Sequence, residues 1–174
     1  MKVMKFGGIS LGTSEAIRNV IDIIKDEKHP VVIVVSALYG VTEQLLKAAN
    51  YALNANKSYE IIVDSIESQH IRIINEIAET EELEAELHNF TASLLEDLKN
   101  ILRGVFLIGD LSQKTSDKIV SYGERLSSLL LSKIIPHATL YDSTQFLKTT
   151  KQFNTHIPDL SLCNELIKKE FHNS

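Results

Sequence analysis

The sequence lacks features that several classes of protein require. Its 174 residues include a single cysteine, Cys163, so the chain cannot form an internal disulfide. No stretch approaches the roughly 20 apolar residues of a membrane-spanning helix. The N-terminal run that starts Met1-Lys2-Val3 is too short for a signal peptide. We therefore expect a cytoplasmic protein without a membrane partner.

A basic surface and metal-ligand patterns are missing as well. With 18 Lys and Arg against 23 Asp and Glu, the net charge is −5, which gives no basic face for nucleic acid. The histidines show no ligand spacing with one another or with Cys163, so we predict no metal site and expect every histidine at the surface. They are His29, His70, His88, His137, His156 and His172.

Enough apolar material is present for a core. Hydrophobic residues make up 44% of the chain and charged residues 24%, so we expect one domain or part of one. From 58 to 103 the apolar pattern predicts two helices, with Gly104 ending the second. Further along, the patterns predict a helix from Thr115 or Ser116, a third strand from Ala138 to Tyr141, and a last helix capped by Asp159 that buries Cys163.

The opening stretch has the pattern of an anion-binding loop. A short strand carrying Lys5 meets Gly7-Gly8, and Thr13 or Ser14 can cap the helix that follows. A Walker loop is excluded because Thr13 stands where its lysine must be, and a dinucleotide fingerprint because Ile9 replaces a required glycine. An ammonium at the end of a buried strand needs a compensating anion. A phosphate is the expected one.

A strand, a helix and a second strand follow one another closely. The β-branched run Val31-Val32-Ile33-Val34-Val35 is typical of a parallel strand buried on both faces, and it ends at Ser36. A right-handed βαβ unit places the glycine loop and Ser36 at the same carboxyl edge of the sheet, where ligands bind. Gly40 allows a tight turn, and Thr42 can either cap the next helix or contact a ligand.

A glycine in the middle of a predicted helix also needs an explanation. Gly123 costs about 1 kcal/mol relative to alanine there. A close approach by another element or by a ligand would account for it. On its own, the neighbouring Glu124 is interpreted as a solvated helix residue.

Three of these segments together resemble one family. Lys5-Phe6-Gly7-Gly8-Ile9-Ser10 resembles the Lys-Phe-Gly-Gly-Thr-Ser signature of the aspartokinases, in the amino-acid kinase superfamily, and departs from it at Ile9. Val35-Ser36-Ala37 and Gly40-Val41-Thr42 resemble the family's Val-Ser-Ala and Gly-Val-Thr segments. Gly123-Glu124-Arg125-Leu126-Ser127 is similar to its Gly-Glu-Arg-Leu-Ser helix. The resemblance runs from Lys2 to about Phe153.

The resemblance implies an α/β fold, a parallel-sheet three-layer αβα sandwich of the amino-acid kinase type that is incomplete at its C-terminal side. It implies transfer of the γ-phosphoryl group of ATP to the β-carboxylate of L-aspartate, giving 4-phospho-L-aspartate in lysine, threonine and methionine biosynthesis, with Mg²⁺ expected beside ATP. It assigns Lys5 as catalytic. It also assigns ATP binding to Lys5, Gly7, Gly8 and Ser10, and aspartate binding to Ser36, Thr42 and Glu124.

The resemblance also sets the expected extent of the chain. The family's Gly-Arg-Gly-Gly-Ser-Asp-like loop and Thr-Asp-Val-Asp-Gly-like segment, which close on the nucleotide, are not found in residues 1–174. We interpret 1–174 as the amino-acid-binding N-terminal half of an aspartokinase catalytic domain, inactive alone, from a homo-oligomeric and in some cases homoserine dehydrogenase-fused protein. Two alternatives stay open: another amino-acid kinase, such as a glutamate or carbamate kinase, and an amino-acid-binding or interaction module without catalysis.

Overall fold

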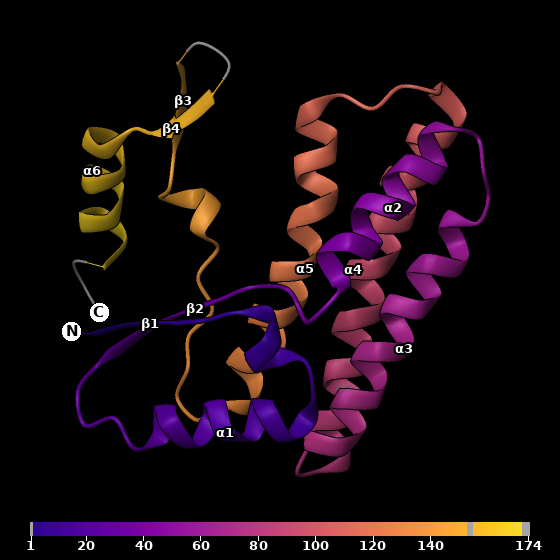
Figure 1. The fold of residues 1–174 in the computed structure, drawn as a ribbon. Coiled ribbons are helices and arrows are strands. Elements are labelled where there is room, and N and C mark those ends of the chain that lie inside the picture. The colour runs from indigo at the N-terminus through magenta and orange to yellow at the C-terminus, as the bar shows by residue number, and fades with distance from the viewer. Residues whose placement is uncertain (1, 153–154, 172–174) are drawn as a thin grey trace. The chain divides into compact units, whose positions relative to one another are not determined.

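The structure, a computed structural model, describes residues 2–152 and 155–171 (Figure 1). The chain divides into two units between Ala138 and Thr139. Phe153 and His172, which figure in the sequence-based expectations, lie outside the described residues. No helix in the described ranges is long and apolar enough to cross a membrane.

The first unit begins with the predicted βαβ unit. Strand β1 (Lys2–Phe6) leads into a short 3₁₀ helix, η1 (Gly8–Leu11), then helix α1 (Ser14–Lys25) and strand β2 (Val31–Val35). The two strands pair in parallel, with Phe6 opposite Val35. The carboxyl ends of both strands therefore meet at one edge, as the sequence predicted.

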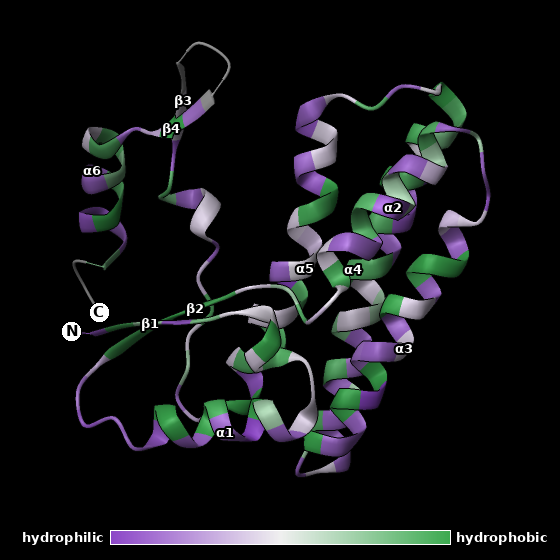
Figure 2. Cartoon of the chain, in the orientation of Figure 1, coloured by the Kyte–Doolittle hydropathy of each residue, from purple (hydrophilic) through white to green (hydrophobic). Residues whose placement is uncertain are grey.

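Four helices complete this unit: α2 (Val41–Leu53), α3 (Tyr59–Ile77), α4 (Glu81–Ile108) and α5 (Gln113–Ile134). Helix α2 packs against α3, α4 and α5, and the four lie together in Figure 1. Hydrophobic and hydrophilic residues alternate along them in Figure 2, as in amphipathic helices. Their buried faces and that of α1 form one continuous core.

Two helix boundaries differ from the sequence-based prediction. Gly104 does not end a helix, because α4 continues to Ile108 and stops at Gly109, whose φ of 70° is left-handed and suits only glycine well. Helix α5 begins at Gln113 rather than at Thr115 or Ser116. Ser112 caps it, with its hydroxyl oxygen accepting from the Thr115 amide at 3.1 Å.

The predicted burial of the 31–35 strand on both faces is wrong, and the neighbouring strand β1 is exposed on the same side. Phe6, Ile33 and Val35 pack against the core. On the opposite face Val3 is 64% exposed and Val34 45% exposed, because the helices of this unit cover only one side of the strand pair. The sheet of β1 and β2 has no further described strand.

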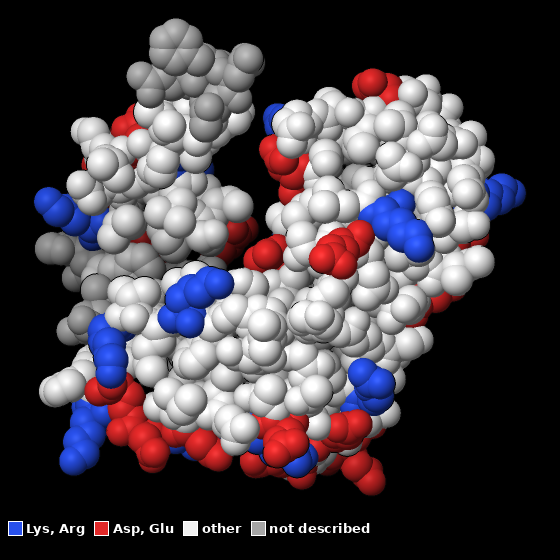
Figure 3. Space-filling model, in the orientation of Figure 1, with Lys and Arg blue, Asp and Glu red and all other residues white. Residues whose placement is uncertain are grey.

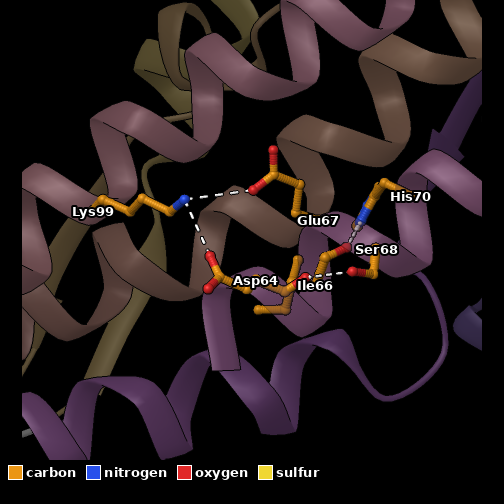
Figure 4. A network of polar contacts seen from close by, with 6 residues as sticks. All are labelled: Asp64, Ile66, Glu67, Ser68, His70 and Lys99. Carbon is orange, nitrogen blue, oxygen red and sulfur yellow. Dashed lines mark hydrogen bonds and ion pairs between the residues drawn. The ribbon is translucent and has the colours of Figure 1, made fainter. Parts of the chain in front are cut away.

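Helix α3 carries the residue that most clearly contradicts the expectation of surface histidines. His70 is 1% exposed, and its Nδ1 lies 2.7 Å from the Ile66 carbonyl oxygen while its Nε2 has no partner among the described residues. Elsewhere on the same helix, Asp64 and Glu67 form ion pairs with Lys99 of α4, at 3.2 Å and 3.4 Å (Figure 4). These ion pairs join α3 to α4, whereas the imidazole contacts a carbonyl oxygen of its own helix.

The second unit is small. It contains a 3₁₀ turn (η2, Ser143–Gln145), an antiparallel hairpin of β3 (Thr149–Gln152) and β4 (Thr155–Pro158), and helix α6 (Leu160–Phe171). Asp159 caps α6 as predicted, accepting from the Leu162 amide at 3.0 Å, and Cys163 is buried as predicted. The predicted strand from Ala138 to Tyr141 is wrong, because these residues have no regular secondary structure and belong to neither described sheet.

Candidate functional site

The glycine loop connects β1 to α1. Gly7 is extended, with φ −85° and ψ 173°, and its carbonyl oxygen accepts from the Ser10 amide at 3.0 Å as η1 begins. Thr13 then caps α1, its hydroxyl oxygen accepting from the Ala16 amide at 3.1 Å. Strand β1, this turn and the capped helix α1 thus follow one another as in an anion-binding segment.

Lys5 lies over this loop. Its ammonium nitrogen is 3.6 Å from the point where a side chain on Gly7 would begin. The residue is exposed, so the expectation that burial of the ammonium forces an anion to bind is wrong. The observation that replaces it is geometric, because a charged nitrogen stands beside bare backbone that an anion can reach.

The loop after β2 packs directly against the glycine loop. A side chain on Gly8 would begin 3.2 Å from the carbonyl oxygen of Ala37, so only glycine fits without displacement. The Ser36 amide donates to the Phe6 carbonyl oxygen at 3.1 Å, which continues the parallel ladder beyond both strands. Ser36 is therefore fixed at the sheet edge next to the glycine pair.

Thr42 does not have the capping role that the sequence allowed. Helix α2 starts at Val41, with Gly40 at the N-cap position in the left-handed conformation (φ 79°) and without a side-chain cap. Thr42 lies in the first turn, and within the described part of the chain its hydroxyl makes no hydrogen bond. This leaves the hydroxyl available to a ligand.

These segments surround a pocket of about 290 Å³. Ile9 and Tyr39, at its rim, are 82% and 65% exposed. Because exposed apolar side chains give no specific sequence pattern, neither was predicted as a lining residue. The lining residues are Gly8, Ile9, Ser36, Ala37, Leu38, Tyr39, Gly40, Thr42 and Glu43.

Helix α5 reaches the same edge through Gly123 and Glu124. A side chain on Gly123 would begin 2.5 Å from the Ala37 Cβ, so a close approach of the chain explains the mid-helix glycine. The half-buried Glu124 accepts from the Ala37 amide at 3.4 Å. The interpretation of Glu124 as a purely solvated residue is therefore wrong.

The predicted site residues thus come from three segments that meet at one sheet edge. The structure brings Ser36 and Thr42 into the pocket with Gly8, and it places Glu124 against the backbone of the next residue, Ala37. Lys5, Gly7 and Ser10 belong to the adjoining loop rather than to the pocket lining.

Acidic and basic side chains are interspersed over the face drawn in Figure 3. In residues 2–152 and 155–171 no group of three His, Cys, Asp or Glu is arranged to hold a metal ion.

The chain is similar to known kinases in sequence. It matches the Amino acid kinase family over residues 1–173. It is 34% identical over 134 residues to the maize bifunctional aspartokinase/homoserine dehydrogenase 1, covering 76% of this chain and 14% of that protein. It is 32% identical over 142 residues to the Candida albicans aspartokinase, covering 76% of this chain and 25% of that protein. The chain therefore spans a quarter or less of these relatives.

Solved structures agree on the fold. E. coli aspartokinase III in complex with aspartate and ADP aligns with a TM-score of 0.83 at 24% identity, over 99% of this chain and 38% of that one. The Clostridium acetobutylicum aspartate kinase aligns with a TM-score of 0.77 at 23% identity, over 99% of this chain and 36% of that one. The predicted α/β fold of the amino-acid kinase type is confirmed. The two relatives above are an aspartokinase and a bifunctional aspartokinase/homoserine dehydrogenase, and from its match over residues 1–173 the chain belongs to the amino acid kinase family.

Proposed function

We propose that the protein containing this chain is an aspartate kinase, which transfers the γ-phosphoryl group of ATP to the β-carboxylate of L-aspartate. The chain spans 14% of the maize relative and 38% of the E. coli structure, so the activity is proposed for the complete protein. Residues 1–174 would supply its amino-acid-binding half.

One observation carries the proposal: the predicted phosphate and amino-acid residues converge on a single backbone segment. The carbonyl oxygen of Ala37 lies 3.2 Å from the point where a side chain on Gly8 would begin, and the amide of Ala37 donates to the Glu124 carboxylate. The same segment carries Ser36 into the pocket. A phosphoryl acceptor held by Ser36 and Glu124 would thus lie beside the loop proposed to bind the donor, as transfer of a phosphoryl group requires.

The glycine loop has the features expected of the phosphate-binding part of the proposed site. Bare backbone at Gly7 and Gly8 lets a phosphate approach closely, and Lys5 Nζ stands next to it. Lys5 would neutralise charge that develops on the transferred group, and the backbone amides would contact its oxygens as a preorganised cradle. Ser10, in the first turn of η1, would add a hydroxyl to the same loop.

The amino-acid-binding part of the proposed site would consist of one charged side chain and two hydroxyl groups. Glu124 would pair with the substrate ammonium, while Ser36 and Thr42 would orient the carboxylates through their hydroxyl groups. The Thr42 hydroxyl is uncommitted in the described structure. Together these contacts would point one carboxylate oxygen along the line of transfer.

Mg²⁺ is expected with ATP because it neutralises phosphate charge. The described residues do not form a carboxylate cluster able to hold it, so we assign no metal ligand and no step to it. A homo-oligomeric state and a cytoplasmic location remain predictions. Several relatives from maize and Arabidopsis are named as chloroplastic proteins.

The proposal is tested by titrating aspartate into the complete protein and its Glu124→Gln variant by calorimetry. A charged hydrogen bond contributes about 1.5 to 3 kcal/mol, so aspartate affinity should fall roughly ten- to a hundredfold, while ATP affinity barely changes. Glu96→Gln is the matched control, since Glu96 is exposed on α4. Unchanged aspartate affinity would remove Glu124 from the site.

The two alternatives are separated by the product. Trapping with hydroxylamine detects an acyl phosphate, so an aspartyl hydroxamate formed from ATP and aspartate would support the kinase. Aspartate binding without hydroxamate would favour a binding module. A hydroxamate formed with glutamate but not aspartate would favour another amino-acid kinase.

A further inference from the structure

Helix α3 contacts the amino-acid side of the site although it contributes no lining residue to the pocket. The Gln69 side-chain amide donates to the Tyr39 carbonyl oxygen at 3.1 Å, and its own oxygen accepts from the Gln44 amide at 3.4 Å. Because a carbonyl can only accept, the Tyr39 contact fixes which end of the Gln69 amide faces which partner. Gln69 therefore ties the loop after β2 to helices α2 and α3.

The same helix also holds the segment that follows the glycine loop. The Glu76 carboxylate accepts a hydrogen bond from the Ser14 hydroxyl, and the Glu76 carbonyl oxygen accepts one from the Arg18 guanidinium. Ser14 is the first residue of α1. Gln69 and Glu76 are two helical turns apart, so they lie on the same face of α3.

Between the Gln69 and Glu76 contacts, the pocket loop (residues 36–40) packs against the glycine loop. A side chain on Gly12 would begin 3.2 Å from the Tyr39 Cβ, and one on Gly8 would begin 3.6 Å from the Tyr39 Cα. Tyr39 therefore packs against both ends of η1. A displacement of Tyr39 would change the separation between the pocket loop and the glycine loop.

We propose that Gln69 and Glu76 are positioning residues, which hold the pocket loop (36–40) and the start of α1 at the separation that phosphoryl transfer needs. The inference rests on the proposed function. Neither residue lines the pocket. Gln69 acts through the Tyr39 carbonyl on the loop that carries Ser36, and Glu76 acts through Ser14 on the helix that the glycine loop leads into.

Kinetics of the complete protein test this assignment. Gln69→Glu keeps the side-chain size but cannot donate to the Tyr39 carbonyl, so KM for aspartate should rise roughly three- to tenfold with a smaller change in kcat. Glu76→Ala should instead raise KM for ATP by a similar factor. A merely structural role would lower the unfolding temperature and leave both KM values alone.

Two controls lie beside Gln69 on the same helix. Ser68→Ala removes the hydrogen bond from the Ser68 hydroxyl to the Asp64 carbonyl, and Glu67→Gln weakens the ion pair with Lys99 (Figure 4). Among the described residues, the hydrogen bonds and ion pairs of both side chains go to Asp64 and Lys99 and not to the pocket loop or α1, so both variants should keep the wild-type KM for each substrate.

Separate outcomes decide the two proposals. If the wild type phosphorylates aspartate and Gln69→Glu has an unchanged KM for it, the positioning role is wrong and the kinase assignment stands. A wild type that neither binds nor phosphorylates aspartate overturns both. If Gln69→Glu fails to fold, Gln69→Met decides: it also removes the donor to the Tyr39 carbonyl but adds no charge, and an unchanged KM for aspartate would then refute the role.

Discussion

Gly123 gives the sharpest test of how α5 meets the sheet edge. Alanine in its place would put a methyl group 2.5 Å from the Ala37 Cβ and 3.4 Å from a Leu45 methyl. Ordinary carbon contacts begin near about 3.5 Å, so α5 or the segment at Ala37 must move by about 1 Å. Gly104 provides the matched control, because a methyl group there would meet nothing within 4 Å.

Two opposing contributions set the expected change in the free energy of unfolding. Alanine stabilises a helix interior by about 1 kcal/mol relative to glycine, at either position. Overpacking a filled site costs about 1 to 3 kcal/mol, and only Gly123→Ala incurs that cost. Gly104→Ala should therefore stabilise the chain by up to about 1 kcal/mol, and Gly123→Ala should lie about 1 to 3 kcal/mol below it.

Thermal unfolding of the 174-residue chain and both variants measures this difference. For a chain of this size each kcal/mol corresponds to about 2 to 4 °C, so the two midpoints should differ by about 2 to 12 °C. In the complete protein, Gly123→Ala should also weaken aspartate, because the Ala37 amide and Ser36 move with the backbone. Equal stabilisation by the two variants would refute the close packing of α5 on Ala37.

In the complete protein, Lys5→Met should lower kcat far more than it weakens aspartate binding, because the ammonium is assigned to the transferred phosphate; near-normal turnover would return Lys5 to an ordinary strand residue. Residues 1–174 alone should form no aspartyl phosphate with ATP and Mg²⁺, since the family segments that close on the nucleotide are not found in this sequence; turnover above background would contradict the half-site assignment. Burial lowers the pKa of His70 below its usual 6.5, so the unfolded chain binds a proton that the folded chain resists, and stability should fall as pH drops below about 6.5. Denaturant titrations at several pH values should show a shallower pH dependence for His70→Leu, and equal slopes would show that His70 protonates freely in the fold.

The sequence predicted the local features of the site because each rests on a rule about neighbouring residues. The cap at Thr13, the turn at Gly40 and the need for a close approach at Gly123 all follow from backbone preferences. The sequence left open whether Thr42 caps the helix or contacts a ligand, because it does not show that Gly40 starts the helix without a side-chain cap.

Other features depend on tertiary packing and leave no local pattern. Lys5 was expected in a buried strand, but the exposed face of the β1 and β2 pair depends on which elements cover it. Gln69 is a polar residue on an amphipathic helix, which alone indicates a solvated face. Its hydrogen bond to the Tyr39 carbonyl depends on the packing of α3 beside the pocket loop, which a local pattern does not encode.

The contact between Glu124 and Ala37 also bears on how the protein folds. It joins residues 87 apart in the sequence, whereas the βαβ unit and the adjacent helix pairs are built from nearer neighbours. Contacts between distant residues form late, since the loop between them must first lose its conformational freedom. A nascent chain would thus complete its glycine loop before α5 docks. The loop proposed to hold the phosphate would therefore form before Glu124, the proposed partner of the substrate ammonium, reaches it.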